Sequence, residues 1–175
     1  MVNAWLNNDS LYIKYGTDEA ASGTQFGVAG ELSTATGLHD ITVILNPLTA
    51  LASTANIIED NLALPVGARV ISVQVVSDLA ATSAGAATLN VGLMKTDRVT
   101  AISDTALLNA VALASINTVG TQTEITVGVA GAGSSLGTSL AFPSYITAKW
   151  GIAAYTAGVV RLRVRYYLLP GTSEV

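Results

Sequence analysis

"GVVRLRVRYYL", residues 158–168, is the stretch that decides the fold, because its side chains change type at every second position. One face of this stretch is apolar and consists of Val160, Leu162, Val164 and Tyr166. The other face is basic and consists of Arg161, Arg163 and Arg165. A period of two residues is typical of a β-strand that buries one face and exposes the other. The sequence therefore predicts a long strand near its end, with the arginines facing outward.

Six further extended segments precede this strand and are separated by turn residues such as Asn46-Pro47 and Gly67. They are residues 39–45 (HDITVIL), 54–59, 68–79 (ARVISVQVVSDL), 86–95 (AATLNVGLMK), 122–129 (QTEITVGV) and 145–153 (YITAKWGIA). In the fifth segment we expect Ile125, Val127 and Val129 to face inward. Because helices do not alternate with these strands, a parallel α/β fold is excluded. The expected fold class is all-β, an antiparallel β-sandwich of seven or eight strands, with a jelly roll as one form of it.

One segment favours a helix. The run ALLNAVALASI (residues 106–116) is rich in Ala and Leu and poor in β-branched residues. Ser103 or Asp104, just before it, could act as the N-cap. We therefore expect a single short helix, which would form a crossover at one end of the sandwich.

Residues 1–37 differ from the rest of the chain. They contain the large side chains Trp5, Leu11, Tyr12 and Tyr15, followed by a small, polar, Gly-rich stretch. We expect an extended N-terminal arm with one short strand over residues 11–15 and then a loop, and a sandwich domain over residues 38–175. Large aromatic residues in an irregular segment need a surface to pack against. Trp5, Leu11, Tyr12 and Tyr15 are therefore candidate interface residues, either on the chain's own domain or on a neighbour.

Charged residues are scarce. The 175 residues include 8 basic and 12 acidic ones, half are hydrophobic, and the mean hydropathy is +0.51. Soluble chains normally devote about a quarter of their residues to charges, so we expect much of the surface to be covered by other chains in a homo-oligomer or larger assembly. The net charge of −4 does not favour nucleic acid. No apolar run approaches the roughly 20 residues of a membrane helix, and residues 1–16 lack the parts of a signal peptide.

The residues that usually perform chemistry are nearly absent. There is no cysteine, and His39 is the one histidine, with its neighbour Asp40 on the opposite strand face. The glycine-rich stretch GVAGAGSSLG (residues 128–137) lacks the Lys-Ser/Thr ending of a phosphate-binding loop. The acidic pairs at 18–19 and 59–60 are expected to be solvated loop charge. We expect no catalytic residue, metal site or cofactor, and therefore no enzyme.

Three of the eight basic residues, Arg161, Arg163 and Arg165, lie on one strand face, and two interpretations stay open. Arginine forms bidentate pairs with carboxylates and tolerates partial desolvation at interfaces. The strip could therefore meet acidic groups of a neighbouring subunit. Alternatively, it is a solvated face whose arginines pair with acidic residues on an adjacent strand of the same sheet.

The stretches LPVGARVISVQVV, ATLNVGLMKTDR and ITAKWGIAAYTAGVVRLRVRYY combine Ala/Thr/Gly-rich strands with few charges. In this texture residues 38–168 resemble the small β-rich virion structural proteins of tailed bacteriophages, including capsid decoration (cement) proteins. The resemblance implies a non-enzymatic dimer or trimer that clamps the major capsid protein on the capsid exterior of the virion and is assembled in the host cytoplasm. The resemblance lies in composition and strand pattern and includes no strict motif, so it assigns no capsid-contact residues in this sequence.

An alternative from a different class is a carbohydrate- or receptor-binding β-sandwich module of a tail fibre or secreted protein. Sugar recognition uses exposed aromatic rings beside polar groups. The aromatic candidates for such a surface are Trp150, Tyr155, Tyr166 and Tyr167.

Overall fold

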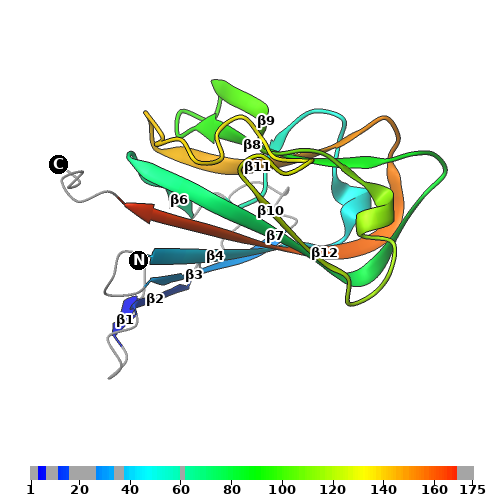
Figure 1. Cartoon of the computed structure of the whole chain (residues 1–175), viewed down its shortest axis with the longest axis horizontal. Coiled ribbons are helices and arrows are strands. Elements are labelled where there is room, and N and C mark those ends of the chain that lie inside the picture. Colours follow the sequence, from blue (N-terminus) through cyan, green and yellow to red (C-terminus); the bar gives the residue numbers. More distant parts are fainter. Residues whose placement is uncertain (1–3, 7–11, 16–26, 34–37, 60–61, 169–175) are drawn as a thin grey trace.

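The fold consists of two antiparallel sheets that lie face to face (Figure 1). The computed structural model describes residues 4–6, 12–15, 27–33, 38–59 and 62–168, the first three ranges as backbone only. The large sheet has the spatial order β1 (Ala4–Leu6), β2 (Tyr12–Tyr15), β3 (Gly27–Ser33), β4 (Leu38–Leu45), β12 (Tyr155–Leu168), β7 (Ala68–Ser83), β10 (Gln122–Thr126). The small sheet has the order β5 (Asn56–Ile57), β11 (Ser144–Gly151), β8 (Thr88–Lys95), β9 (Ala101–Ala112), and β6 (Ala63–Leu64) also pairs with β11. The predicted β-sandwich is confirmed.

The strand pairs of the sandwich are nested in the sequence. The first strand, β4, pairs with the last, β12, and β5 pairs with β11. Inside these lie the pairs β7 with β10 and β8 with β9. Successive pairs alternate between the large and the small sheet. Most strands therefore find their partners far away in the chain.

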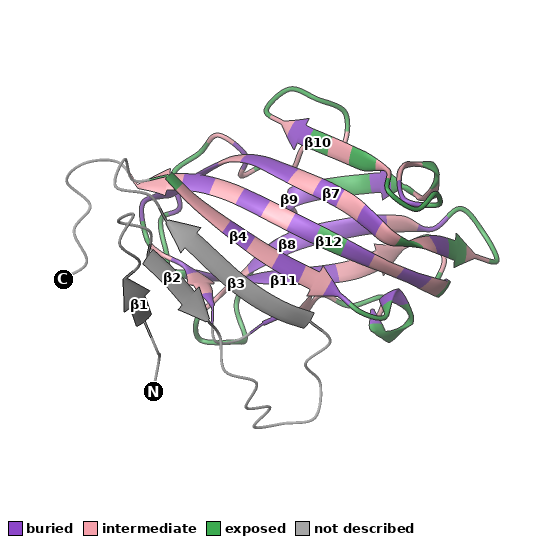
Figure 2. Ribbon diagram, turned by 90° about the horizontal axis from the view of Figure 1, so that it is seen from below, coloured by how far each residue is buried: buried purple, intermediate pink, exposed green. Residues whose placement is uncertain are grey.

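Burial alternates along the strands as the sequence predicts. In β12 the apolar face is at most 1% exposed, and its partners Ile41, Val43 and Leu45 on β4 are equally buried. Figure 2 shows this as alternating bands of buried and half-buried residues along β4, β12 and β7. The hydrophobic effect on one face of each strand thus sets the register of both sheets.

The helix predicted from ALLNAVALASI is wrong, because residues 101–112 form the strand β9. Ala106, Leu107 and Leu108 are all completely buried. β9 pairs with β8 on one edge, while the connection that follows β10 bonds to its other edge. Tertiary pairing on both edges overrides the helix propensity of Ala and Leu. The helical elements among the described residues are two short 3-10 turns, η1 (Leu48–Ala50) and η2 (Leu113–Ser115).

The strand predicted over residues 122–129 ends early, at Thr126. Ile125 is buried as predicted, but the inward placement of Val127 and Val129 is wrong, since they are 61% and 45% exposed. From residue 127 the chain turns and runs along the opening between the sheets as the β10–β11 connection, residues 127–143. Its backbone bonds to β9 through Ser135 and to β7 through Gly137, so it closes this side of the sandwich.

Residues of the N-terminal arm extend the large sheet beyond β4. The short strand expected over residues 11–15 corresponds to β2, whereas Leu11 lies outside the described residues. In place of the expected loop, β3 pairs with β4 from Gly27↔Leu45 to Ser33↔His39. This pairing covers the edge that β4 would otherwise expose. The division into an arm over 1–37 and a sandwich over 38–175 stays a prediction.

Candidate interface on the large sheet

A ladder of ion pairs crosses the outer face of the large sheet at the three predicted arginines. At one end, Arg161 on β12 binds Asp78 on β7 with two parallel hydrogen bonds. Arg161 Nη2 donates to Asp78 Oδ1 at 2.6 Å, and Nε donates to Oδ2 at 3.1 Å. This is the fork geometry that makes arginine–carboxylate pairs specific. The hydrogen bond with Asp78 raises the pKa of Arg161.

The centre of the ladder is Asp40 on β4, which accepts hydrogen bonds from Arg163 and forms a longer ion pair with Arg165. Arg163 Nη2 and Nε lie 2.6 Å and 3.4 Å from its two carboxylate oxygens. Arg165 Nε lies 3.6 Å from Oδ2. The Asp40 side chain is only 16% exposed, so water competes less for this carboxylate than for the others of the ladder. Asp40 therefore joins the first strand of the sandwich to the last.

At the other end, Arg165 reaches across a strand to Glu124 on β10, with Nη1 3.3 Å from Oε1. The residue opposite Arg165 on the intervening strand β7 is Ser72, and the residue opposite Ser72 on β10 is Thr126. Ser72 is 4% exposed although it lies on the outer face. A small side chain at this position leaves room for the arginine to pass over β7.

The ladder balances its own charge, since three arginines meet three carboxylates. The carboxylates lie on the strands β4, β7 and β10 of the same sheet. This geometry corresponds to the second interpretation from the sequence, pairing within the sheet. The role of Arg161, Arg163 and Arg165 in an interface with another chain stays a prediction. Burying a face against a neighbouring chain costs less desolvation free energy when its charges are already paired than when its arginines are unpaired.

The other predicted interface residues lie on the same sheet at its far edge. Trp5 is on β1, and Tyr12 and Tyr15 are on β2, separated from β12 by β3 and β4. Their backbone positions are described, but their side chains are not, and Leu11 lies outside the described residues. The fold thus places the backbone of Trp5, Tyr12 and Tyr15 on the same sheet as the arginines, with β3 and β4 between them and β12.

The aromatic candidates for sugar binding do not form an exposed platform. Tyr155 and Tyr166 are 4% and 1% exposed. Tyr166 stacks on His39, with ring centroids 4.6 Å apart. Trp150 is half-buried and packs against the core. Burial raises the pKa of the Tyr155 phenol. Tyr155 and Tyr166 thus serve packing, whereas Tyr167 is half-buried with the Arg69 guanidinium carbon 6.0 Å from its ring centroid.

The remaining titratable groups form no metal site within the described part of the chain. Glu59, expected to be solvated, is 8% exposed, because residues 56–59 run along β11. Its neighbour in the sequence pair, Asp60, lies outside the described residues, as does the pair at 18–19. In the described ranges no helix is long and apolar enough to span a membrane.

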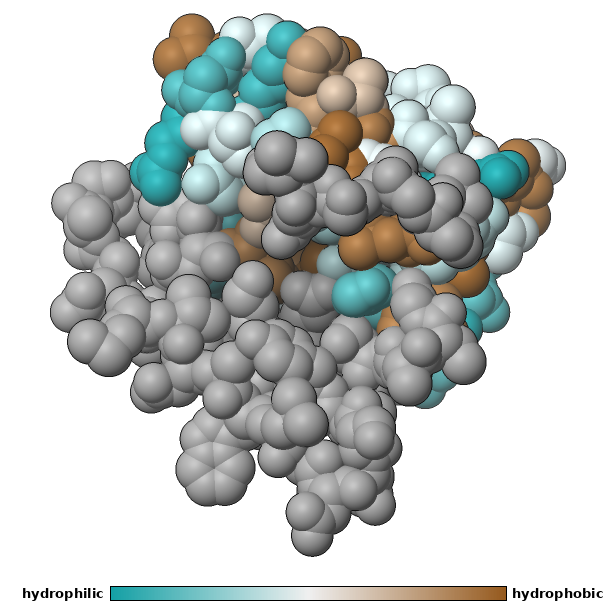
Figure 3. All heavy atoms as spheres, turned by 90° about the vertical axis from the view of Figure 1, so that its left-hand side faces the viewer, coloured by the Kyte–Doolittle hydropathy of each residue, from teal (hydrophilic) through white to brown (hydrophobic). Residues whose placement is uncertain are grey.

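Exposed apolar side chains are a feature that the sequence pattern did not identify. Val99 is 83% exposed and Ile152 is 77% exposed, each in a turn between strands. Ile152 also has a positive φ of 69°, an unfavourable conformation for a β-branched residue. Figure 3 shows that on the face drawn there apolar residues reach the surface at several separate places among polar ones.

No protein-family model and no curated protein matches the sequence. Among solved structures, the chain is similar to a chain of the capsid asymmetric unit of cyanophage Pam1, with a TM-score of 0.48 and 25% identity over 87% of this chain and 94% of that chain. It is also similar to a chain in the acidic stable capsid structure of Helicobacter pylori bacteriophage KHP30, with a TM-score of 0.48 and 15% identity over 75% and 87%. Both descriptions name bacteriophage capsids. At this TM-score neither similarity by itself assigns a function.

Proposed function

We propose that this chain is a bacteriophage virion structural protein, and more specifically a capsid decoration (cement) protein. In this role it binds the exterior of the shell formed by the major capsid protein, as a homo-oligomer, after synthesis in the host cytoplasm. The observation that carries the proposal is a surface with few charges and many exposed apolar side chains. Such a surface is suited to being covered by other chains.

The surface supports the proposal in two ways. First, 8 basic and 12 acidic residues share an accessible surface of 8810 Å², and six of these charges already neutralise one another in the ladder. Second, large apolar residues that are at least 38% exposed occur at many sites in the described ranges. They are Leu38, Val66, Leu79, Val99, Ile102, Val119, Val127, Val129, Phe142 and Ile152. Removing apolar surface from water is favourable by about 25 cal/mol per Å², before the entropic cost of association is subtracted.

The strand order supports a rigid building block. The nested pairs β4·β12, β5·β11, β7·β10 and β8·β9 are distributed alternately over two sheets. This order supports the proposal that the sandwich is an eight-stranded jelly roll, a fold that occurs among viral capsid domains. Fold alone does not determine function. A jelly roll does supply a stiff body, and repetition of that body over a symmetric shell turns modest contacts into high avidity. A protein that binds only the assembled shell stabilises it by mass action.

Virions purified from the source and separated into heads and tails test the proposal. We expect mass spectrometry to find the chain in the head fraction, and external protease to cleave it there while the shell stays intact. Recovery in the tail fraction would contradict the decoration role and leave a virion role. Absence from both fractions would contradict the virion role itself.

Self-association is tested separately by size exclusion with light scattering at low and high salt. We expect a dimer or trimer, and dissociation by salt would implicate the arginine ladder, because salt screens exposed charges. A variant that lacks residues 1–16 tests the arm. If it folds and saturates capsids with unchanged affinity, the arm takes no part in the interface.

A further inference from the structure

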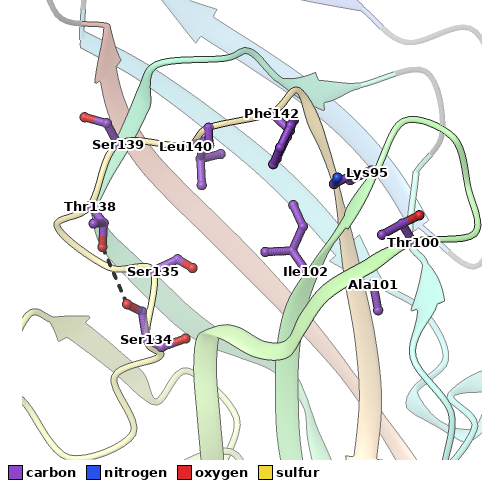
Figure 4. Close-up of a pocket in the computed structure, with 11 residues that line it drawn as sticks. Lys95, Thr100, Ala101, Ile102, Ser134, Ser135, Thr138, Ser139, Leu140 and Phe142 are labelled. Carbon is purple, nitrogen blue, oxygen red and sulfur yellow. Dashed lines mark hydrogen bonds between the residues drawn. The ribbon is translucent and has the colours of Figure 1, made fainter.

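A cavity of about 510 Å³ lies between the start of β9 and the β10–β11 connection (Figure 4). Its volume is within the range of about 300–1,000 Å³ that is usual for ligand pockets. Lys95, Ala101 and Ile102 line it from the β8–β9 hairpin, and Ser135, Leu140 and Phe142 line it from the connection. The cavity is separate from the arginine ladder, which lies on the other sheet.

The cavity opens where the connection leaves the edge of β9. β9 is the last strand of the small sheet, so one of its edges has no strand beside it. The connection covers part of this edge, because Ser135 N–H donates to Ala106 O at 2.8 Å and Gly133 N–H donates to Leu107 O at 3.0 Å. Within the described ranges, no backbone hydrogen bond joins the connection to residues 101–105. This part of the β9 edge therefore faces the cavity without a main-chain partner.

The hairpin geometry turns the backbone of Ala101 toward the cavity. Lys95 N–H donates to Thr100 O at 2.9 Å, and the next opposed pair is Met94 with Ala101. In antiparallel ladders hydrogen-bonded and non-hydrogen-bonded pairs alternate, so the N–H and C=O of Ala101 point away from β8. Backbone groups in this position are a template for a further strand.

The side chains around the cavity define what that strand would carry. Ile102, Leu140 and Phe142 point toward the middle of the cavity (Figure 4). Ile102 and Phe142 are still 38% and 48% exposed. Lys95 Nζ lies 3.7 Å from the centroid of the Phe142 ring. Among the described residues that line the cavity, Lys95 is the one charged side chain and none carries a carboxylate. The site therefore offers an apolar contact beside a lysine whose charge also acts on Asp97 in the β8–β9 turn, outside the cavity lining.

We propose that this cavity binds an extended peptide segment of another polypeptide by strand addition to β9. The segment pairs its backbone with Ala101, places an apolar side chain against Ile102 and Phe142, and places a carboxylate on the same strand face at Lys95. Backbone pairing supplies affinity, and the two side chains supply specificity. The inference needs a polypeptide partner but does not depend on the virion role.

The probe is the peptide acetyl-Thr-Val-Thr-Asp-Thr-amide, in which Val and Asp share one strand face. Its binding to the full chain is followed by chemical shifts in two-dimensional NMR spectra. We expect shifts at Ala101, Ile102 and the 134–142 segment, and binding about fivefold tighter than that of the peptide with Lys in place of Asp. Methylation of the peptide's backbone amides should abolish binding, because strand addition requires them.

Two matched variants test whether Lys95 is the residue that recognises the peptide carboxylate. Lys95→Met retains most of the apolar stem and should remove the preference for the acidic peptide. Lys149→Met, whose lysine pairs with Asp104 at 2.7 Å outside the cavity, should retain it. The proposal is overturned by equal binding of the acidic and basic peptides, by binding that survives amide methylation, or by no shift in this region at millimolar peptide.

Discussion

Arg163 and Asp40 are 123 residues apart in the sequence, yet their side chains form a hydrogen-bonded ion pair, with Nη2 and Oδ2 separated by 2.6 Å. They lie diagonally on β12 and β4, the last and first strands of the sandwich. The same carboxylate also faces Arg165. One aspartate therefore connects β4 to β12, and its loss affects two arginines at once.

Asp40→Asn should lower the free energy of unfolding by about 1 kcal/mol, because it removes the negative charge that faces two arginines at a poorly solvated position. Glu124→Gln should lower the free energy of unfolding by less than Asp40→Asn does, since Glu124 is 47% exposed and pairs with one arginine. Urea denaturation at low salt and at about 1 M salt measures both, and salt should shrink the difference. Equal costs for the two variants would contradict this ranking.

Asp97 should titrate far below an ordinary aspartate. Its carboxylate accepts from the Thr100 hydroxyl at 2.6 Å and from the backbone N–H groups of Thr100 and Val99, and these bonds lower its pKa from 3.8 to about 2. Because the folded pKa is below the unfolded one, the resulting stability is present above pH 3.8 and is lost as the pH falls toward 2.

The check is an NMR titration of the Asp97 carboxyl carbon in the wild type and in Thr100→Val. The variant lacks the hydroxyl donor, so the pKa of Asp97 should rise toward 3.8. An unchanged pKa in Thr100→Val would assign the shift to the backbone donors alone.

Gly133→Ala should destabilise the contact between the β10–β11 connection and β9. An added Cβ would overlap the Ala106 carbonyl group, which is backbone and cannot move aside without breaking the neighbouring hydrogen bonds. Overpacking of this kind costs about 1–3 kcal/mol. Gly120→Ala is the control, because Gly120 has open space but a φ of +80°, for which strain alone costs about 1 kcal/mol.

Thermal unfolding compares the two glycine variants, and hydrogen exchange reports on the amides of Gly133 and Ser135. We expect both amides to exchange faster in Gly133→Ala and not in Gly120→Ala. A Gly133→Ala protein at least as stable as Gly120→Ala, with protected amides, would show that the connection does not pack closely on β9.

Ile152→Asn should stabilise the isolated chain by about 1 kcal/mol, because Asn tolerates the positive φ that strains a β-branched residue. Ile152 is 77% exposed, so the substitution forfeits little buried surface. Ile152→Val retains the β-branch and should give no gain. The midpoint of thermal unfolding is the measurement, and a decrease for Ile152→Asn would mean that the side chain contributes packing that outweighs its backbone strain.

For the arginine ladder, the alternation of residue types predicted the strand face but not the ion-pair partners. The period of two in residues 158–168 placed Arg161, Arg163 and Arg165 together on an outward face, and the structure confirms that face. Pairing within the same sheet was one of two interpretations, but its partners could not be named. Asp40, Asp78 and Glu124 lie on three different strands, so their proximity depends on strand order, which local periodicity does not encode.

The sequence by itself determined the fold class, because alternation of apolar and polar residues decides which face of each strand leaves water. The sequence did not predict the strand β9, because its consecutive buried residues Ala106, Leu107 and Leu108 show no alternation of apolar and polar side chains. The β9 edge at Ala101, the cavity beside it and the partners of the ladder were decided only by the tertiary structure. Their physical reason is shared: each depends on which distant strands become neighbours, and that is a property of the whole chain's packing.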